Sequence, residues 1–323
     1  RKTDINQAFH RALNLRNHLW HKHDLSAKFA TIRGYAPDYA LAPDGKYLTS
    51  WTSVYKTGPS VVLNSTRCTI GEQLHWIMKE RPPYILSYPH NFHALALRCR
   101  EIGVTMPWLK ALITFSEALS PGKRAIIEDT FGVLVEDMYS AAEVSMIALQ
   151  CPEDPGHYHV QSENVLVEVV NDDGAPCAVG ETGRLLVTDL HNFAMPFVRY
   201  EIGDLATIGP ACKCGRGLPV LTRIMGRARA MLTLPDGSRS WPLMGGSRFA
   251  EIAPVRQYQF VQKSRQAIEA RLVVERPLNE QEEEALRERM LARLGHPFEI
   301  KLSYVKKIER QAGEKYEEFK SEL

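Results

Sequence analysis

Apolar side chains recur at helical spacing in three separate stretches of the first third of the chain. In each stretch they fall three or four positions apart among polar residues, which is the pattern of a helix with one buried face. The predicted helices span residues 5–20, 72–80 and 91–101. Short apolar segments with the length of strands occur at residues 28–32, 60–63, 84–88 and 111–115. Alternating strands and helices predict an α/β fold with a largely parallel sheet.

The pattern changes near Asn164. From there the chain is rich in β-forming residues, interrupted by Asp-Gly and Gly-Pro turn signals. This predicts a β-rich, more antiparallel subdomain over about residues 160–225. Two further strand-like segments, a polar helix and the segment EIKLSYV then predict a small β-β-α-β unit. We therefore expect a large domain over residues 1–225 and a small α+β domain over residues 226–323.

The helix of the small unit has clear start and stop signals. Asn279 with Glu282 three residues later is the signature of a capping box. Gly295 follows the last apolar position and is expected to end the helix.

Composition narrows the class of protein. Lys and Arg number 40 against 38 acidic residues, a net charge of +2, so no broad basic face is expected for nucleic acid or membrane lipid. Six cysteines in 323 residues are too few for a disulfide-stapled secreted fold. No apolar run reaches the length of about 18 residues that a membrane span needs, and the N-terminal residues lack the apolar core of a signal peptide. We expect a cytoplasmic protein, and because Arg1 stands where a Met would begin a protein, we expect the chain to start inside a longer polypeptide.

Four charged residues are placed where they could act on a nucleotide. Glu143 lies just beyond the predicted strand GVLVEDMY, where an acid could hold a metal ion at phosphates. Asp204 follows Gly203 in a predicted turn and offers two acceptor oxygens for ribose hydroxyls. Arg227 could reach phosphate or ribose oxygens, and Lys315 could neutralise charge during group transfer. Taken singly, each is better interpreted as an ordinary solvated surface residue.

Six short motifs are specific for a protein family only when their order and spacing are considered together. They are SEALSPGKR (116–124), YSAAE (139–143), MPFVRYEIGD (195–204), CKCGRG (212–217), IMGR (224–227) and GEK (313–315). Together they resemble the adenylate-forming enzymes of the phenylacetate-CoA ligase type, with the nearest likeness to the capsule-biosynthesis branch of that group. The resemblance implies a large α/β domain, present here only in part, with a β-rich subdomain and a mobile C-terminal lid.

The resemblance also implies an activity. Such enzymes activate a small carboxylic acid with ATP and Mg²⁺ to an acyl adenylate, release pyrophosphate, and usually pass the acyl group to a thiol of CoA or of a phosphopantetheine carrier protein. Transfer of AMP to a deazaflavin is a related possibility. The resemblance implies that Glu143 binds magnesium and takes part in catalysis, that Asp204 binds the ribose, and that Arg227 contacts ribose or phosphate. The adenine pocket would be lined by Ser116, Glu117 and Ala118, with Tyr139 in contact with the base. Lys315 would be a catalytic residue on the lid, which rotates about the segment after Gly226.

The chain departs from the family pattern in several places. It contains no Ser/Thr/Gly-rich phosphate-binding loop, which in the family precedes the segment matching the start of this chain. Ala142 replaces a hydroxyl residue, Arg229 replaces a hinge carboxylate, and Glu314 replaces the glycine before the mobile lysine, so Lys320 is a second candidate for that lysine. These departures keep open a second hypothesis, an adenylation fold that has lost catalysis and serves as a binding scaffold.

The cysteines in CKCGRG are part of a further expectation. Some members of the group hold a structural zinc with one upstream cysteine and histidine and a downstream Cys-x-Cys. The matching residues here are Cys151, His159, Cys212 and Cys214, with His157 a weaker match than His159. Three thiolates and one imidazole form a closed tetrahedral zinc set. A redox pair and three unconnected thiols are the alternatives.

The acid substrate is not specified by the sequence. By position in the family, the residues expected near it are Tyr88, His90, Asn91, Phe92 and Met138, with core packing the preferred interpretation of Phe92. A homodimer is possible, and the residues do not decide it.

Overall fold

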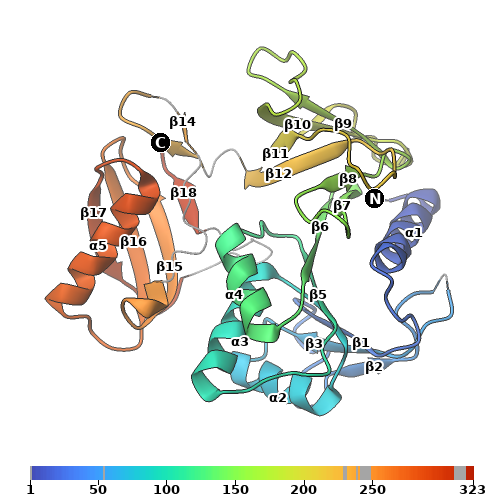
Figure 1. Ribbon diagram of the computed structural model, residues 1–323, viewed down its shortest axis with the longest axis horizontal. Helices are drawn as coiled ribbons and strands as arrows, with labels where there is room; N and C mark the ends of the chain where they lie inside the picture. The colour runs from blue at the N-terminus through green and yellow to red at the C-terminus, as the bar shows by residue number, and fades with distance from the viewer. Residues whose placement is uncertain (1, 54, 228–230, 238, 241–248, 309–317) are drawn as a thin grey trace. The chain divides into compact units, whose positions relative to one another are not determined.

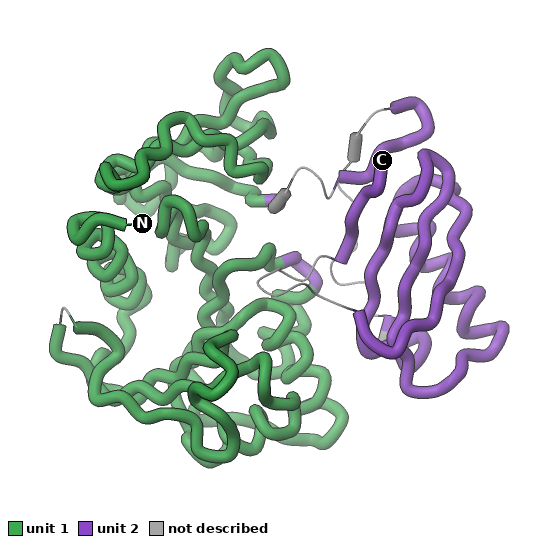
Figure 2. The backbone as a smooth tube through the Cα atoms, turned by 180° about the vertical axis from the view of Figure 1, so that it is seen from behind, with its two compact units in different colours: residues 1–119, 123–224 green, residues 120–122, 225–323 purple. Residues whose placement is uncertain are grey.

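The computed structural model describes every residue except 1, 54, 228–230, 238, 241–248 and 309–317. The chain forms two compact units, shown in different colours in Figure 2. The first contains residues 1–119 and 123–224, and the second contains residues 120–122 and 225–323. Each unit has a hydrophobic core of its own.

Five parallel strands form one half of the large sheet in the first unit (Figure 1). They lie in the order β3-β1-β4-β5-β6, with the short β2 antiparallel to β3 at the edge. Their bounds are β1 Phe29–Arg33, β2 Lys46–Leu48, β3 Ser60–Asn64, β4 Tyr84–Ser87, β5 Ala111–Phe115 and β6 Val135–Ala141. The expected parallel α/β arrangement is confirmed.

Helices connect the parallel strands. They are α2 (Ile70–Glu80), α3 (Pro89–Ile102) and α4 (Pro121–Phe131), and α4 is the one that the hydrophobic pattern did not predict. Thr69 and Glu72 form a capping box at the start of α2. Gly103, in the left-handed conformation, ends α3. Among the described residues, no helix has both the length and the apolar character needed to cross a membrane.

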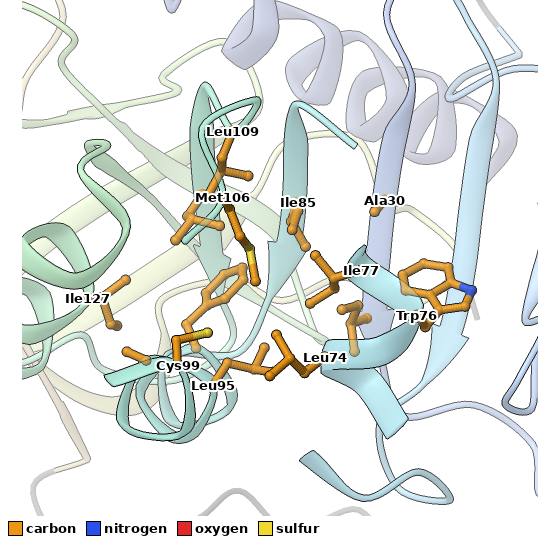
Figure 3. Close-up of a cluster of buried hydrophobic side chains, with 14 of the residues drawn as sticks. Ala30, Leu74, Trp76, Ile77, Ile85, Leu95, Cys99, Met106, Leu109 and Ile127 are labelled. Atoms are coloured by element: carbon orange, nitrogen blue, oxygen red, sulfur yellow. The ribbon is translucent and has the colours of Figure 1, made fainter. Parts of the chain in front are cut away.

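The core of this half lies between the helices and the sheet. Trp76 and Ile77 of α2 and Leu95 of α3 are almost fully buried against strand residues such as Ile85 (Figure 3). Each such side chain contributes about 1.5–3 kcal/mol through burial of apolar surface. This packing fixes the parallel strands, whose carboxyl ends carry the candidate site.

Antiparallel strands continue the same sheet beyond β6. The order is β6-β7-β8-β12-β11-β10-β9. Their bounds are β7 Ser145–Gln150, β8 Tyr158–Val160, β9 Val165–Val170, β10 Thr182–Asp189, β11 Tyr200–Ile208 and β12 Val220–Arg227. Helix α1 (Asp4–Trp20) packs against β7, and its Leu13 shares a core with Met146 and Leu149. The predicted helix over residues 5–20 is thereby confirmed.

One local prediction in this half is wrong. The sequence placed Asp204 in a turn after Gly203, but both residues lie inside β11. The pairing of β11 with β10 shifts register between Arg184 and Leu186, so β11 bulges opposite that point. Gly203 has a φ of +84°, which glycine adopts without steric strain. The Gly-Asp pair therefore marks a bulge that presents Asp204, and the local sequence alone does not distinguish a bulge from a turn.

The second unit is built on a four-stranded sheet in the order β17-β16-β15-β18. Its main elements are β15 Val255–Gln262, β16 Ala267–Val274, α5 Glu280–Leu294, β17 Glu299–Tyr304 and β18 Phe319–Ser321. A two-stranded pair, β13 Leu232–Thr233 and β14 Arg239–Ser240, and a 3-10 turn, η2 Phe249–Glu251, complete it. The β-β-α-β order is as predicted, with β18 added in parallel to β15. The predicted capping box of Asn279 and Glu282, and the helix end at Gly295, are both present.

Candidate functional site

The carboxyl ends of β4, β5 and β6 bring most of the expected nucleotide-site residues to one edge of the sheet. These strands are parallel neighbours, so the residues that follow them emerge side by side. Tyr88 follows β4, Ser116 begins the turn after β5, and Glu143 follows β6. Ligands of open α/β sheets bind at this kind of edge.

The turn after β5 holds a tight imidazole–carboxylate pair. Ser116 has a φ of +71°, a conformation unusual for a residue with a side chain. The next residue, Glu117, lies 2.6 Å from Nδ1 of His90 through its Oε2. Burial by itself would raise the pKa of Glu117, but the hydrogen bond and charge of His90, with the charge of Lys123, outweigh it and lower that pKa. Glu117 is therefore a carboxylate that orients His90, while Ala118 beside it is exposed.

An aromatic stack lies next to this pair. The ring of Tyr88 is stacked with His90 at a centroid distance of 5.5 Å and with Phe115 at 5.0 Å. The Tyr88 hydroxyl accepts a hydrogen bond from the backbone N–H of Gly34. Two of the residues expected near an acid substrate, Tyr88 and His90, thus lie at this edge.

The other three residues of that expected set are part of the interior. Asn91 is buried and donates to Gln73 and to Ser87 Oγ. Phe92 is 1% exposed and belongs to the core between helices and sheet, as the core-packing interpretation predicted. Met138 is buried in the core under α1.

Tyr139 and Asp204 meet across the junction of the two halves of the sheet. The Tyr139 hydroxyl donates to Oδ2 of Asp204 at 2.6 Å, although the residues are 65 positions apart. Burial, and then the negative charge of Asp204, raise the pKa of Tyr139 well above its usual value, with a smaller contribution from Glu143. Tyr139 therefore stays protonated and holds Asp204 in place. The phenol is thus in contact with the carboxylate of Asp204, and the negative charge of Glu143 also acts on it.

Glu143 itself is available for a ligand. It is only partly buried and forms no ion pair with any residue that the structure describes. A partly exposed carboxylate beyond a strand end is suited to an oxygen-preferring cation such as Mg²⁺.

Not every expected residue can be placed. Lys315 lies outside the described residues, and so does the side chain of Arg227, although the backbone of Arg227 ends β12. The second lysine candidate, Lys320, is in β18, with its Nζ 3.7 Å from a carboxylate oxygen of Glu322.

Sequence reasoning missed a buried carboxylate that braces this edge. Asp137 on β6 accepts hydrogen bonds from Thr114 Oγ1 at 2.7 Å and from the Tyr158 hydroxyl at 2.9 Å. Burial raises its pKa in spite of these bonds. The available signal was an acidic residue inside an apolar strand, two positions before Tyr139. Asp137 links β5, β6 and β8 and so supports the strand that carries Tyr139.

The four expected zinc ligands converge in the antiparallel half. Cys151 directly follows β7, His159 lies in β8, and Cys212 and Cys214 lie in the connection from β11 to β12. Pairing of β8 with β7 and with β12 brings these segments together. One ligand atom from each residue lies within 4.8 Å of the other three.

The distances within this cluster match a tetrahedral metal site. Cys212 Sγ lies 3.9 Å from Cys151 Sγ, and Cys214 Sγ lies 3.2 Å from His159 Nε2. With zinc–sulfur bonds of 2.3 Å, a tetrahedron requires sulfur atoms roughly 3.8 Å apart. The distance also excludes a disulfide between Cys151 and Cys212 in this structure.

Electrostatics around the cluster favour metal ligands. Burial lowers the pKa of His159, which keeps its imidazole neutral. Burial tends to raise the pKa of Cys214, but hydrogen bonds from the Arg216 backbone and side chain outweigh it and lower that pKa. Arg216 also lies 3.8 Å from Cys151 Sγ and 3.1 Å from Glu153. The neutral imidazole of His159 and the stabilised thiolate of Cys214 are forms that bind zinc, whereas burial raises the pKa of the Cys212 thiol to about 11.

Comparisons with known proteins agree with this arrangement. Residues 247–322 match the family model of the CapK C-terminal domain. The chain is 30% identical to a phenylacetate-coenzyme A ligase of Thermus thermophilus over 168 residues, which are 50% of this chain and 38% of that protein. It is 32% identical to the phenylacetate-coenzyme A ligase of Escherichia coli over 131 residues, 40% of this chain and 27% of that protein. Over these segments the chain is similar in sequence to phenylacetate-CoA ligases.

Solved structures confirm the expected fold. A 2-hydroxyisobutyryl-CoA ligase, crystallised in the postadenylation state with an acyl-AMP ligand, superposes with a TM-score of 0.72 at 18% identity, over 96% of this chain and 69% of that one. The chain thus has the fold of adenylate-forming CoA ligases, with a large mixed α/β sheet and a separate smaller sheet. The aligned segments span less than half the length of the two curated ligases.

Proposed function

We propose that the protein to which this chain belongs activates a carboxylic acid with ATP to an acyl adenylate, releases pyrophosphate, and transfers the acyl group to the thiol of CoA. The single observation that carries the proposal is the contact between Tyr139 and Asp204, with Glu143 beside them. An oriented carboxylate, and an acid without a described ion-pair partner, at the carboxyl edge of a parallel sheet in a chain similar to CoA ligases support this proposal.

Asp204 acts as the ribose anchor in this proposal. Its Oδ2 is occupied by Tyr139, so the carboxylate cannot rotate away from the site. An ionised carboxylate with a fixed orientation accepts hydrogen bonds from two neighbouring hydroxyls. Tyr139 therefore acts through Asp204 as a positioning residue.

Glu143 acts as the magnesium ligand. Mg²⁺ bound there would reduce the repulsion between the acid and the α-phosphate, which are both anionic. Glu143 contributes charge from the turn between β6 and β7, where its side chain is partly exposed to solvent. Lys315 and Arg227 are the proposed cations on the opposite side of the transferred group, and the small C-terminal unit is the proposed lid that delivers Lys315.

His90 is the proposed contact for the acid. Its Nδ1 is hydrogen-bonded to Glu117, which fixes the plane of the ring. The neighbouring Tyr88 ring supplies an apolar surface. A small carboxylic acid with a flat or short apolar body fits these two groups.

We propose in addition that Cys151, His159, Cys212 and Cys214 hold a structural Zn²⁺. The set of four protein ligands leaves no open coordination position for a substrate. The ion would tie the connection between β11 and β12 to the end of β7. It would therefore stabilise the β-rich subdomain without taking part in the reaction.

The test is pyrophosphate release by the full-length protein with ATP, magnesium and a panel of aryl, acyl, hydroxy and amino acids. Release with one class of acid, followed by thioester formation when CoA is added, is the expected result. Glu143→Gln and Asp204→Asn should each abolish most of it. Asp173→Asn, which changes an exposed acid in the same unit, should leave it unchanged.

Two results would contradict the proposal. Absence of release with every acid, despite measurable ATP binding, would favour the scaffold hypothesis or a deazaflavin acceptor. Release that is indifferent to Glu143→Gln and Asp204→Asn would place the reaction elsewhere.

A further inference from the structure

A cavity of about 450 Å³ lies at the other edge of the same parallel strands. The first residues of three strands line it, namely Tyr84 of β4, Ala111 of β5 and Val135 of β6. The candidate nucleotide site follows the last residues of these strands, about 15 Å away along a five-residue strand. All of the lining residues belong to the first unit. The cavity is therefore separate from the proposed catalytic edge.

Buried histidines and one glutamate form the inner wall of the cavity. His18 Nδ1 lies 2.9 Å from His23 Nδ1, and His23 Nε2 lies 2.7 Å from Glu136 Oε1. His21 Nδ1 lies 3.3 Å from the same carboxylate oxygen. Three of these side chains, His21, His23 and Glu136, line the cavity. The sequence signal is the stretch HLWHKHD, residues 18–24, which the proposed function leaves unexplained.

Two polar atoms of this wall lack partners. Glu136 Oε2 and His21 Nε2 are buried and have no hydrogen-bond partner within the described part of the chain. The side chains are only 8% and 9% exposed. A buried charged oxygen without a partner is unfavourable by several kcal/mol, so native proteins rarely leave one unsatisfied. Glu136 can only accept a hydrogen bond, so its missing partner is a donor such as a hydroxyl group.

The rim of the cavity is basic. Arg124 is paired with Glu128, and Arg216 is paired with Glu153. Lys22 and Lys110 also line the cavity, but neither forms an ion pair with a described residue. The charges of Arg124 and Arg216 are balanced by glutamates, whereas those of Lys22 and Lys110 are not balanced by a described ion pair. The remaining positive charge favours binding of an anion.

One wall of the cavity is aromatic. Tyr84 stacks on His23 at a centroid distance of 4.3 Å, and Trp20 lines the other side. The guanidinium of Arg216 lies 4.8 Å from the Trp20 ring centroid, which holds that ring in place. Flat apolar surfaces of this kind bind aromatic rings.

We propose that this cavity is a second binding site, specific for an aromatic anion that carries a hydroxyl group. The acidic group, a carboxylate or a phosphate, lies at Lys22 and Lys110. The ring lies against Trp20 and Tyr84, and the hydroxyl donates to Glu136. The site does not depend on adenylation, because no residue of the proposed nucleotide site contributes to it.

Binding of four probes to the full chain, measured by calorimetry, tests the proposal. The probes are para-hydroxybenzoate, benzoate, para-hydroxybenzyl alcohol and hydroquinone monophosphate. We expect the hydroxylated anions to bind at least about tenfold more tightly than benzoate or the neutral alcohol. The ratio between para-hydroxybenzoate and hydroquinone monophosphate identifies the preferred acidic group.

Variants assign the binding to this cavity. Lys110→Ala and Lys22→Asn should each weaken both acids by about threefold, the scale of a half-exposed ion pair. Asn is used at position 22 because Lys22 has a φ of 54°, which Asn tolerates. Glu136→Gln should remove most of the preference for para-hydroxybenzoate over benzoate. Lys56→Ala, at an exposed lysine outside the cavity, and Asp204→Asn should leave all four affinities unchanged.

Three outcomes overturn the proposal. Failure of all four probes to bind at about 10 mM excludes an aromatic anion. Binding that disappears in Asp204→Asn but survives in the lysine variants places the ligand at the nucleotide edge. Equal affinity for para-hydroxybenzoate and benzoate removes the role assigned to Glu136. None of these results bears on pyrophosphate release, so the two proposals fail separately.

Discussion

The Cys/His cluster and the carboxyl edge of the parallel strands differ in how closely their functional side chains lie together. In the cluster, four ligand atoms already lie within 4.8 Å of one another. At the carboxyl edge, the described side chains form two separate pairs, Tyr139 with Asp204 and His90 with Glu117. The cluster joins His159 of β8 to residues that follow β7 and that connect β11 to β12, whereas the two pairs at the edge join β6 to β11 and α3 to the turn after β5.

The difference shows how each site is completed. A closed metal site needs only a cation, because its four ligand atoms already lie close together. A site for an acid and a nucleotide must admit and release its substrates, and its groups come from separate elements of the fold. Stability should therefore depend on the cluster, and nucleotide affinity should depend on the edge.

Loss of the metal should have the largest effect. Cys212→Ser removes one ligand, and we expect a loss of bound zinc and of several kcal/mol of the free energy of unfolding, since a structural zinc contributes about 10 kcal/mol in small domains. Metal content by mass spectrometry and denaturant unfolding measure the two quantities. Cys68→Ser, at a buried cysteine outside the cluster, is the control. Equal zinc content and equal stability in both variants would show three unconnected thiols.

Substitutions at Asp204 should separate affinity from stability. Asp204→Asn keeps an acceptor for the Tyr139 hydroxyl but loses the charge, so we expect about a hundredfold weaker ATP binding and unchanged stability. Asp204→Ala also leaves the Tyr139 hydroxyl unsatisfied, which should lower the free energy of unfolding by about 1–3 kcal/mol. Calorimetric ATP titration and denaturant unfolding of both variants check this. Zinc content should stay the same in each, and a change in it would mean that the two sites are coupled.

The sequence predicted the helices, strands and family motifs better than it predicted which side chains contact one another. Hydrophobic periodicity located α1, α2 and α3, because each buries one face. It missed α4, whose buried positions include Lys123 and do not form a simple apolar stripe. Motif order located Tyr139 and Asp204, but their hydrogen bond depends on a bulge set by the pairing of β10 with β11.

The same limit applies to the buried polar groups. Asp137 meets Thr114 and Tyr158, and Glu136 meets His23, only through the packing of segments that are far apart in the sequence. Local sequence shows that these residues are polar but not which partner each one meets. The Cys/His cluster could be predicted because thiol and imidazole side chains in a family-like spacing have few alternative uses.

Acidic pH should lower the stability of the region around α1, because the buried His18 has a lowered pKa. Burial, and then the charges of His23 and His21, lower the pKa of His18 from 6.5 to about 3, and Glu136 lies beyond His23 in the same group. Between these two pH values the unfolded chain binds a proton that the folded chain does not, so stability falls as pH falls, by about 1.4 kcal/mol per unit and about 2 kcal/mol at pH 5. Above pH 6.5 this contribution is complete.

Unfolding free energies of the native chain and of His18→Gln, measured from pH 7 to pH 4, check this contribution. We expect a shallower slope in the variant. Trp20 at the end of α1 contacts His159 at a ring distance of 5.7 Å, so zinc should also be lost more readily in acid from the native chain. Equal slopes would show that His18 is solvated in solution.

Tyr139→Phe should have the smallest effect. It removes the hydrogen bond that fixes Asp204 while keeping the ring, and we expect ATP binding to weaken by about tenfold, or about 1.4 kcal/mol. If Tyr139 acts only through Asp204, the double variant Tyr139→Phe with Asp204→Asn should bind ATP no more weakly than Asp204→Asn alone. Additive losses would instead mean that Tyr139 contacts the nucleotide directly, as the family resemblance first implied. That result would make the phenol part of the ligand surface and would leave Asp204 without its proposed support.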